Sequence, residues 1–585
     1  MSSRQTSQSL PYDHEVRTAV LDTHRSFAVS APAGSGKTGL LTQRVLALLG
    51  QCDQPENILA ITFTKKAAAE MKHRILTALQ STQQKIAQGE APPTDDYSKT
   101  TWDLAAQVLK RNDEKQWQLL SLPNRLNITT IDSFCRQLSQ QTPLTNDLGG
   151  TPDVLDNAEI NYAYQLAARD TLASIESDQQ IKPDLIRLIK HFNNQLGTLE
   201  ELFMRLLQRR DQWLGLLYAT KNQREYLEET LQTVISDHLQ KTTEAILPYS
   251  GEILALADFA ANNCLQDNIE SPLNTCIGIT ELPSEHYDAI EQWLGLTELI
   301  TTKSGDVRKS VTKTIGFPAV DKKTRSDEDN IINKRQKQRV NDLLKELKNE
   351  EHLAELLHQI RTLPSPNYKD SQWDLLDSLT RVLLVLVAKL DLTFINLGKT
   401  DFINITLAAL RALGDEDEPT NLALILDYRI QHILVDEFQD TSSPQLYLLK
   451  KLTAGWQPDD GRSLFLVGDA MQSCYSFRDA NVGIFLDVRQ HGLGDIALEA
   501  VNLTVNFRSD NAIVNWCNQV FAHVFPLDDE TNQGAVKYQQ ALAFNTETED
   551  LALVSSNNAI GSYLFVSEEK TKQRTQEANK IVELI

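Results

Sequence analysis

The sequence predicts an α/β fold in which a parallel-sheet domain is interrupted by a large α-helical insert. Residues 27–49 read as a short buried strand, a glycine-rich turn and an amphipathic helix. Strand-to-helix patterns recur at 58–75 and 127–135, and strand patterns resume at 433–436. Between about 150 and 400 the pattern is almost entirely helical. With 585 residues the chain is too long for a single core, so we expect several domains.

The glycine-rich turn at 30–38 reads Ser-Ala-Pro-Ala-Gly-Ser-Gly-Lys-Thr. Gly34 and Gly36 allow backbone N–H groups to converge on phosphate oxygens, and the N-terminus of the next helix adds partial positive charge. Lys37 can reach the outer phosphates, and the hydroxyl of Thr38 can bind Mg²⁺. An ordinary glycine turn is the alternative, which the flanking strand and helix disfavour. The predicted nucleoside-triphosphate loop comprises Ala31, Pro32, Ala33, Gly34, Ser35, Gly36, Lys37 and Thr38.

The other elements are predicted from their apolar patterns. An apolar run at 58–63 predicts a strand, and the helix formers after it predict a helix to residue 75. The middle of the chain predicts amphipathic helices, for example at 161–173, 199–217 and 340–357. We find no catalytic constellation in this helical part. A final helix is predicted at 575–585.

A pair of carboxylates completes the predicted nucleotide site. Asp436 and Glu437 follow the apolar strand that begins at His432. Parallel sheets bind ligands at the carboxyl ends of their strands, so both side chains should face the site. Asp436 is suited to holding Mg²⁺, and Glu437 to accepting the proton of an attacking water. A solvated acidic turn is the alternative, which the phosphate loop disfavours.

Two further segments combine polar, aromatic and basic residues after strands. In the first, Gln472 can orient water or sense a phosphate, while Tyr475, Phe477 and Arg478 can stack on bases and neutralise phosphates. The aromatic pair is equally compatible with a place in the core. In the second segment Arg508 can supply charge to the γ-phosphate from another domain, or serve as a surface ion-pair residue.

Composition limits the other functions. The net charge of −22 argues against non-specific wrapping of nucleic acid by the whole surface, although a locally basic channel remains compatible. Six scattered cysteines without a Cys-x-x-Cys pair indicate a reduced compartment and no zinc or iron–sulfur site. The polar N-terminus and the short apolar run at 382–388 predict no signal segment and no membrane span. We therefore expect a cytoplasmic protein.

One stretch departs from the acidic balance. Residues 301–350 carry a net charge of +5. The stretch can contact duplex or single-stranded nucleic acid, or it can be a solvated loop and helix. The second reading is favoured.

Six segments, taken in order, resemble the superfamily 1A DNA helicases of the UvrD, Rep and PcrA type. They are the loop at 31–38, Thr-Phe-Thr-Lys-Lys-Ala-Ala-Ala-Glu-Met at 62–71, Thr-Ile-Asp-Ser-Phe-Cys at 130–135, Val-Asp-Glu-Phe-Gln-Asp-Thr at 435–441, Val-Gly-Asp-Ala-Met-Gln-Ser-Cys-Tyr-Ser-Phe-Arg at 467–478 and Asn-Phe-Arg-Ser at 506–509. The form at 130–135 and the long insert with Leu-Leu-Gln-Arg-Arg-Asp-Gln-Trp at 206–213 resemble the RecB and AddA branch. The resemblance implies a P-loop NTPase with RecA-like domains that moves 3′→5′ on single-stranded DNA while hydrolysing ATP.

The resemblance also implies roles for individual residues. Lys37 would bind the β- and γ-phosphates, and Thr38 with Asp436 would hold Mg²⁺. Glu437 would activate water, and Gln472 would sense the γ-phosphate.

In the same family pattern Arg508 would be the arginine finger, and Phe507 would stack on adenine. The implied contacts to single-stranded DNA are Thr62, Phe63, Tyr475, Phe477 and Arg478. The implied biology is double-strand-break processing and recombinational repair, with a second helicase–nuclease subunit of the AddB or RecC/RecD kind as a partner.

Three departures from the family pattern modify these expectations. The adenine-reading glutamine is not evident at 12–17, so selectivity for ATP is less secure. Asp479 stands where glycine is usual. The later helicase motifs and the nuclease domain of the RecB and AddA branch are missing, so we expect an N-terminal fragment of a protein roughly twice this length.

The expected division is a RecA-like domain at 1–148 and 401–498, a helical insert at 149–400, and an incomplete second RecA-like domain at 499–585. A superfamily 1B RNA helicase is one alternative, which the Asp-Glu-Phe-Gln-Asp and Gln-Ser-x-Tyr-x-Phe-Arg patterns disfavour. A module that binds nucleotide and DNA without turnover is the other.

Overall fold

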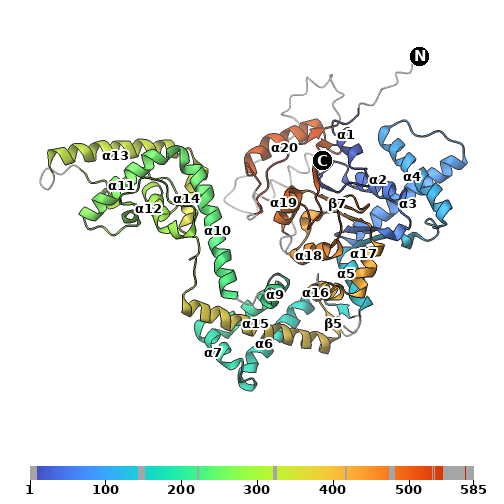
Figure 1. The fold of residues 1–585 in the computed structure, drawn as a ribbon, viewed down its shortest axis with the longest axis horizontal. Helices are drawn as coiled ribbons and strands as arrows, with labels where there is room; N and C mark the ends of the chain where they lie inside the picture. The colour runs from blue at the N-terminus through green and yellow to red at the C-terminus, as the bar shows by residue number, and fades with distance from the viewer. Residues whose placement is uncertain are drawn as a thin grey trace, which may run out of the picture. The chain divides into compact units, whose positions relative to one another are not determined.

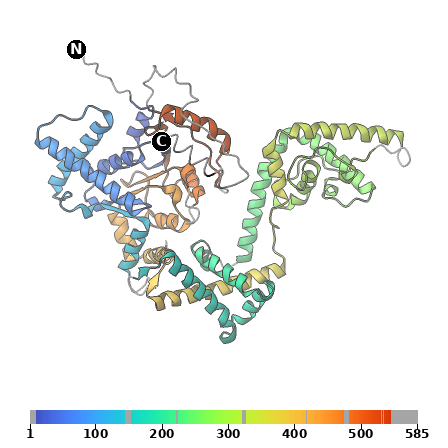
Figure 2. The same cartoon turned by 180° about the vertical axis from the view of Figure 1, so that it is seen from behind.

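The computed structural model describes residues 10–142, 152–219, 223–319, 326–415, 418–473, 481–529, 531, 534–544 and 574. These residues divide into two compact units (Figures 1 and 2). The first unit is drawn from 1–168, 202–213 and 388–585, and the second from 169–201 and 214–387. The helix predicted at 575–585 and the aromatic segment at 474–480 lie outside the described residues.

A parallel six-stranded sheet forms the centre of the first unit, in the order β3-β2-β6-β7-β1-β8. The strands are β1 (Phe27–Ser30), β2 (Ile58–Thr62), β3 (Asn127–Thr130), β6 (His432–Val435), β7 (Ser463–Gly468) and β8 (Glu499–Asn502). The four inner strands are buried along their whole length, as expected for strands that are covered on both faces. The predicted α/β class with a parallel sheet is confirmed.

Helices cover both faces of this sheet and give it two apolar cores. One core joins the sheet to α2, α3 and α4, and includes Leu41 and Ile75; the other joins it to α5, α16, α18 and α19, and includes Phe438 and Phe485. The helices of this unit are α1 (His14–Ala19), α2 (Lys37–Leu49), α3 (Lys65–Ala87), α4 (Asp96–Lys115), α5 (Ile131–Gln141), α16 (Phe402–Leu413), α17 (Asn421–Arg429), α18 (Ser443–Leu452), α19 (Val482–His491) and α20 (Asn511–Val524), with 3₁₀ turns η1 (Pro55–Asn57), η2 (Pro123–Arg125), η7 (Phe438–Asp440) and η8 (Ala470–Gln472).

Strand β8 corrects one predicted domain boundary. We expected residue 499 to open a second domain, but Glu499 pairs with Phe27 and β8 is the edge strand of the first sheet. Its sequence, Glu-Ala-Val-Asn, lacks an apolar run because an edge strand is partly exposed. The chain leaves this sheet after the buried Leu503. It then forms a separate parallel pair of β9 (Val505–Asn506) and β10 (Leu542–Ala543), with α20 between them in sequence.

The ends of the helical insert meet in a second small parallel pair. Strand β4 (Asp153–Val154) pairs with β5 (Lys399–Thr400). The compact second unit is smaller than the predicted insert at 149–400, because both ends of that range, up to residue 168 and from residue 388, group with the first unit, as do residues 202–213. The helices near these junctions are α6 (Asn157–Ser177), α8 (Leu196–Gln208), α9 (Arg210–Ala219) and α15 (Asp370–Leu397). The single helix predicted at 199–217 is therefore two helices, α8 and α9.

The second unit is helical, as predicted, and has its own core around Trp293, Leu256 and Val340. Its further elements are α7 (Lys182–His191), α10 (Gln223–Ile246), α11 (Ser250–Gln266), α12 (Ile290–Ile300), α13 (Asp327–Leu347), α14 (Glu351–Ile360), η3 (Leu247–Tyr249), η4 (Pro272–Cys276), η5 (Tyr287–Ala289) and η6 (Lys313–Ile315). The helix predicted at 340–357 is interrupted between α13 and α14. Over the described residues, no helix combines the length and apolar character that crossing a bilayer requires.

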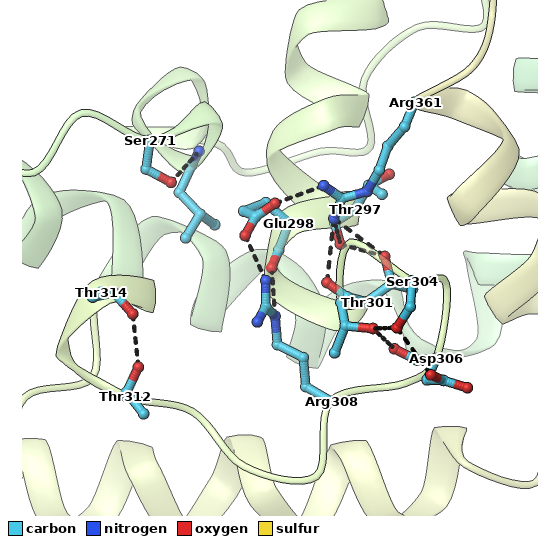
Figure 3. Close-up of polar contacts among 12 residues, drawn as sticks. Ser271, Thr297, Glu298, Thr301, Ser304, Asp306, Arg308, Thr312, Thr314 and Arg361 are labelled. Carbon is cyan, nitrogen blue, oxygen red and sulfur yellow. Dashed lines mark hydrogen bonds and ion pairs between the residues drawn. The ribbon is translucent and has the colours of Figure 1, made fainter.

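Ion pairs within the second unit neutralise part of the basic stretch at 301–350. Glu298 accepts from Arg308 at 2.5 Å and from Arg361 at 2.8 Å (Figure 3). Arg339 donates to Glu252 at 2.6 and 2.9 Å. Of the basic residues on α13, Lys334, Arg335 and Lys345 are exposed.

Candidate nucleotide-binding site

The glycine-rich turn joins β1 to α2 at the carboxyl edge of the six-stranded sheet. Gly34 and Gly36 have φ angles of +81° and +79°, a left-handed conformation that other residues adopt only with strain. The N–H of Ala31 donates to the carbonyl of Gly468 at 2.8 Å, which fixes the start of the turn against β7. Among the described residues, the buried hydroxyl of Ser35 has no hydrogen-bond partner. The predicted loop therefore has the backbone that a phosphate cradle requires.

Lys37 lies at the first turn of α2 and faces the two predicted carboxylates. Its Nζ is 2.5 Å from Oε2 of Glu437 and 3.7 Å from Oδ1 of Asp436. The Lys37 side chain is 16% exposed, that of Asp436 9% and that of Glu437 35%. The loop and the acidic pair are about 400 residues apart in the sequence, yet the sheet places them in direct contact.

Glu437 is held in a strained backbone conformation. Its φ is +55°, which is uncommon for a residue with a side chain. The N–H of Glu437 donates to Oδ1 of Asp436 at 3.0 Å, and Nε2 of Gln439 donates to Oε2 of Glu437 at 2.9 Å. Strain of this kind collects at functional sites, where neighbouring contacts hold the residue in place.

Three carboxyl groups in this region, those of Asp436, Asp440 and Asp469, have raised pKa values, each chiefly because of burial. Burial raises the pKa of Asp436 to about 6; the charge of Glu437 adds to this effect and the charge of Lys37 opposes it. Burial, with the charge of Glu437, also raises the pKa of Asp440 to about 6. Perturbed carboxyl groups beside a strained loop are typical of a functional site rather than of a solvated turn.

Gln439 connects the acidic pair to β7, a role that the sequence did not indicate. Its Oε1 accepts from the N–H of Asp469 at 2.9 Å, while its Nε2 donates to Glu437. A carboxylate oxygen of Asp469 in turn accepts from Nε2 of Gln472. Gln472, predicted to sense phosphate, is thus linked to Glu437 through Asp469 and Gln439. Gln439 lies within the Asp-Glu-Phe-Gln-Asp pattern, but the pattern alone gave it no role, because its partner Asp469 lies 30 residues further along the chain.

The segment Asn506–Arg508 docks on the glycine-rich turn. The N–H of Phe507 donates to the carbonyl of Gly34 at 2.8 Å, and Nδ2 of Asn506 donates to the carbonyl of Ala33 at 3.2 Å. A Cβ added at Gly34 would lie 2.5 Å from Oδ1 of Asn506, so this approach requires glycine. Phe507 and Arg508 lie beside the turn, and both are exposed to solvent. The structure therefore brings both predicted residues to the loop.

Asp13 and Arg17 also belong to the site, although the sequence analysis found no reader of the base at 12–17. Arg17 donates to the carbonyl of Ser35 at 2.8 Å, and its guanidinium carbon lies 4.9 Å from the centre of the Phe507 ring. Asp13 is buried and accepts from Arg17. The pair could not be recognised because its partners lie in distant parts of the chain.

The predicted contacts to single-stranded DNA are only partly described by the structure. Tyr475, Phe477 and Arg478, together with Asp479, lie outside the described residues. Thr62 is 1% exposed and lines a pocket together with Phe63, so its contact with DNA stays a prediction. It is the last residue of β2, and this strand is buried to its end. Phe63, the next residue, is partly exposed and lines a pocket together with Asp436 and Glu437.

Comparisons with known proteins agree with this geometry. The model of the UvrD/REP helicase N-terminal domain matches residues 12–492. An ATP-dependent helicase/nuclease subunit of Lysinibacillus sphaericus is 26% identical over 86% of this chain and 39% of its own length. The protein of the same name from Exiguobacterium sibiricum is 24% identical over 99% of this chain and 45% of its own length. The chain thus spans less than half the length of these relatives, and over most of its own length it belongs to the UvrD/REP helicase family.

Proposed function

We propose that this chain is an ATP-dependent DNA helicase or translocase of the AddA/RecB kind, which moves 3′→5′ on single-stranded DNA. The observation that carries the proposal is the contact of Lys37 with Glu437 at the carboxyl edge of the sheet, beside the docked segment Asn506–Arg508. Family membership supports the same activity, as do the relatives that are named ATP-dependent helicase/nuclease subunits.

The nucleotide in this proposal is ATP with Mg²⁺. The left-handed glycines, the helix N-terminus and the unpartnered Ser35 hydroxyl among the described residues fit a phosphate group. Thr38 and Asp436 would hold Mg²⁺, which would neutralise charge on the phosphates. Because the pKa of Asp436 is about 6, its carboxyl group is mostly ionised at neutral pH and can serve as a ligand.

The Lys37–Glu437 pair suggests how turnover depends on the nucleotide. Without phosphate, Lys37 neutralises Glu437 and occupies the carboxylate that should accept a proton. When Lys37 turns to the phosphates, Glu437 is released to act as the general base. Gln472 and Arg508 would then contact the γ-phosphate, and Phe507 would stack on the base.

The DNA would pass over Phe63 and the segment that carries Tyr475, Phe477 and Arg478, where aromatic rings stack on successive bases. We place the protein in the cytoplasm, in double-strand-break processing and recombinational repair. The five described cysteines are free and four are buried, which fits a reducing compartment.

The proposal is tested by measuring ATP hydrolysis with and without single-stranded DNA, and with RNA of the same sequence. We expect stimulation by DNA and little by RNA. ATP binding without stimulated turnover would identify a non-motor module, and preference for RNA would identify an RNA helicase. Unwinding of duplexes with a 3′ or a 5′ tail then tests the direction, because only the 3′-tailed duplex should open.

We also propose that the chain works with a second subunit of the AddB or RecC/RecD kind. The relatives that it matches are themselves named as subunits. Affinity purification of the tagged chain from its native cell should recover such a partner in equal amount. Recovery of the chain alone, with full activity, would contradict this part of the proposal.

A further inference from the structure

Asp13 connects the N-terminal segment to the point where the chain leaves the six-stranded sheet. Its carboxylate accepts from Nε and Nη2 of Arg17 at 2.7 and 2.9 Å. The same carboxylate accepts from the backbone N–H groups of Thr504 and Val505 at 3.0 and 3.1 Å. Thr504 and Val505 follow Leu503 directly, and Val505 is the first residue of β9, the strand that leads into the docked segment Asn506–Arg508. Asp13 is therefore an anchor for the start of that strand.

Arg17 extends the connection to the glycine-rich turn. The same Nη2 that contacts Asp13 also donates to the carbonyl of Ser35 at 2.8 Å. Its guanidinium carbon lies 4.9 Å from the centre of the Phe507 ring, and its Nη1 would lie 3.6 Å from a Cβ at Gly36. One planar cation thus touches the turn and the aromatic residue of the docked segment, while the bidentate pair with Asp13 holds it in place.

The position of this pair has a mechanical consequence. A phosphate bound in the turn would contact the backbone near Ser35 and Gly36. A displacement of β9 would change the positions of the Thr504 and Val505 amides. Because both places are bonded to the same ion pair, a change at one alters the hydrogen bonds available at the other. Coupling through such a connected set of contacts typically amounts to about a 5- to 150-fold effect on the second site.

We propose that Asp13 and Arg17 are positioning residues that couple occupation of the glycine-rich turn to the placement of Phe507 and Arg508. The inference deepens the proposed function and rests on it for the activity readout. Neither residue needs to touch the reacting atoms. Arg17 would act on Arg508 through its contact with Phe507, and Asp13 would act through Arg17 and through the start of β9.

The first test compares Arg17→Met with Arg25→Met. Methionine retains most of the packing of an arginine stem but lacks the guanidinium. Arg25 is a matched control, because it pairs with Glu499 at the exposed edge of the same sheet and is not placed at the turn. We expect Arg17→Met to lower kcat of DNA-stimulated hydrolysis about 10- to 100-fold with KM for ATP changed less than about threefold. Arg25→Met should match the parent chain.

A double variant separates positioning from a general structural role. If Arg17 acts through Arg508, Arg17→Met combined with Arg508→Ala should lose no more activity than Arg508→Ala alone. Losses that multiply would overturn the proposed route. Arg17→Lys should recover only part of the activity, because a single ammonium group cannot reproduce the planar fork.

A second measurement does not require turnover. Hydrogen exchange at the amides of Thr504 and Val505 should slow when the analogue AMP-PNP binds to the parent chain and to Arg25→Met. In Arg17→Met the analogue should still bind but should leave exchange at these amides unchanged. If Arg17→Met responds like Arg25→Met in both assays, the coupling role is wrong. If the parent chain lacks DNA-stimulated hydrolysis while these amides respond as expected, the proposed function is wrong and the coupling role stands.

Discussion

The first compact unit contains two groups of charged residues that are built in opposite ways. At the root of the insert, Arg210 donates to Asp401 at 2.5 Å, and Tyr164 donates to the second oxygen of Asp401 at 2.6 Å. The N–H of Asn404 donates to the same carboxylate at 2.8 Å. At the candidate nucleotide site, Lys37 faces both Asp436 and Glu437, but of these two it lies within hydrogen-bond distance of Glu437 alone.

The pKa values of the two aspartates express this difference. Burial by itself would raise the pKa of Asp401, but the charge and hydrogen bonds of Arg210, with those of Tyr164 and Asn404, lower it below its usual value. Burial raises the pKa of Asp436 to about 6, because Lys37 compensates only partly. Both oxygens of the Asp401 carboxylate have hydrogen-bond partners inside the fold. The charge of Asp436 is only partly compensated, which is the arrangement expected of a carboxylate that binds a cation.

The largest expected effect comes from removing the functional cation. Lys37→Ala should lower kcat for ATP hydrolysis by at least about 10³-fold, because a phosphate-binding charge is lost from a preorganised site. Lys110→Ala, which changes an exposed lysine paired with Glu114, should match the parent chain. Steady-state hydrolysis with single-stranded DNA measures both. Turnover that survives Lys37→Ala would mean that the glycine-rich turn is not the nucleotide site.

Replacing the proposed base should separate binding from chemistry. Glu437→Gln should retain ATP binding and lose about 10²- to 10⁴-fold in kcat, which is the usual contribution of general acid–base catalysis. Equilibrium binding of a fluorescent ATP analogue and single-turnover hydrolysis provide the two measurements. Loss of binding with an unchanged chemical step would contradict the role given to Glu437. Glu114→Gln is the exposed control.

Breaking the structural pair should affect stability. Arg210→Met leaves Asp401 buried without its cation, which typically costs about 3–5 kcal/mol in the free energy of unfolding. Arg74→Met removes an exposed pair with Glu70 on α3 and should cost about 0.5 kcal/mol or less. Denaturant unfolding followed by circular dichroism measures both. Equal losses of stability in the two variants would contradict the distinction between the buried and the exposed ion pair.

The raised pKa of Asp436 predicts a stabilising substitution. Because folding raises this pKa from 3.8 to about 6, ionisation of Asp436 opposes folding, and the cost grows as the pH rises through this interval. Asp436→Asn removes the cost and should stabilise the fold by up to about 3 kcal/mol at pH 7.5, with about half of that gain at pH 5. Asp401→Asn should destabilise the fold at pH 7.5, because the pKa of Asp401 is lowered. A gain in stability from Asp436→Asn that increases as the pH falls would contradict the raised pKa of Asp436.

The smallest effect is expected on α13 of the second unit. Reversal of charge at Lys334, Arg335 and Lys337 should leave DNA affinity within about twofold and the salt dependence unchanged, if these residues are solvated. Arg339 is excluded from this set because Glu252 already pairs with it. Nitrocellulose filter binding over a range of salt concentrations measures the effect. A salt slope that falls by about 3 would instead identify three phosphate contacts.

The sequence predicted the parts of the site that depend on neighbouring residues. The glycines at 34 and 36, the adjacent Lys37 and the carboxylates at the end of β6 follow from local patterns of strand, turn and helix. Parallel strands also share a carboxyl edge, so the contact between Lys37 and Glu437 could be expected before the structure. The place of edge strand β8 in this sheet was not predicted, because its exposed residues form no apolar pattern.

The long-range polar contacts could be decided only by the tertiary structure. Arg210 and Asp401 are 191 residues apart, and Asp13 and Thr504 are 491 residues apart. No spacing in the sequence predicts such pairs, since any arginine in the chain can in principle pair with any carboxylate. The burial of Thr62 depends in the same way on what packs over the end of β2. The amino-acid sequence therefore sufficed for the family, through its ordered motifs, and for the inner strands and the glycine-rich turn, because these depend on local backbone preferences. Only the three-dimensional packing shows that the charge of Asp401 is fully compensated inside the fold and that the charge of Asp436 is compensated only in part.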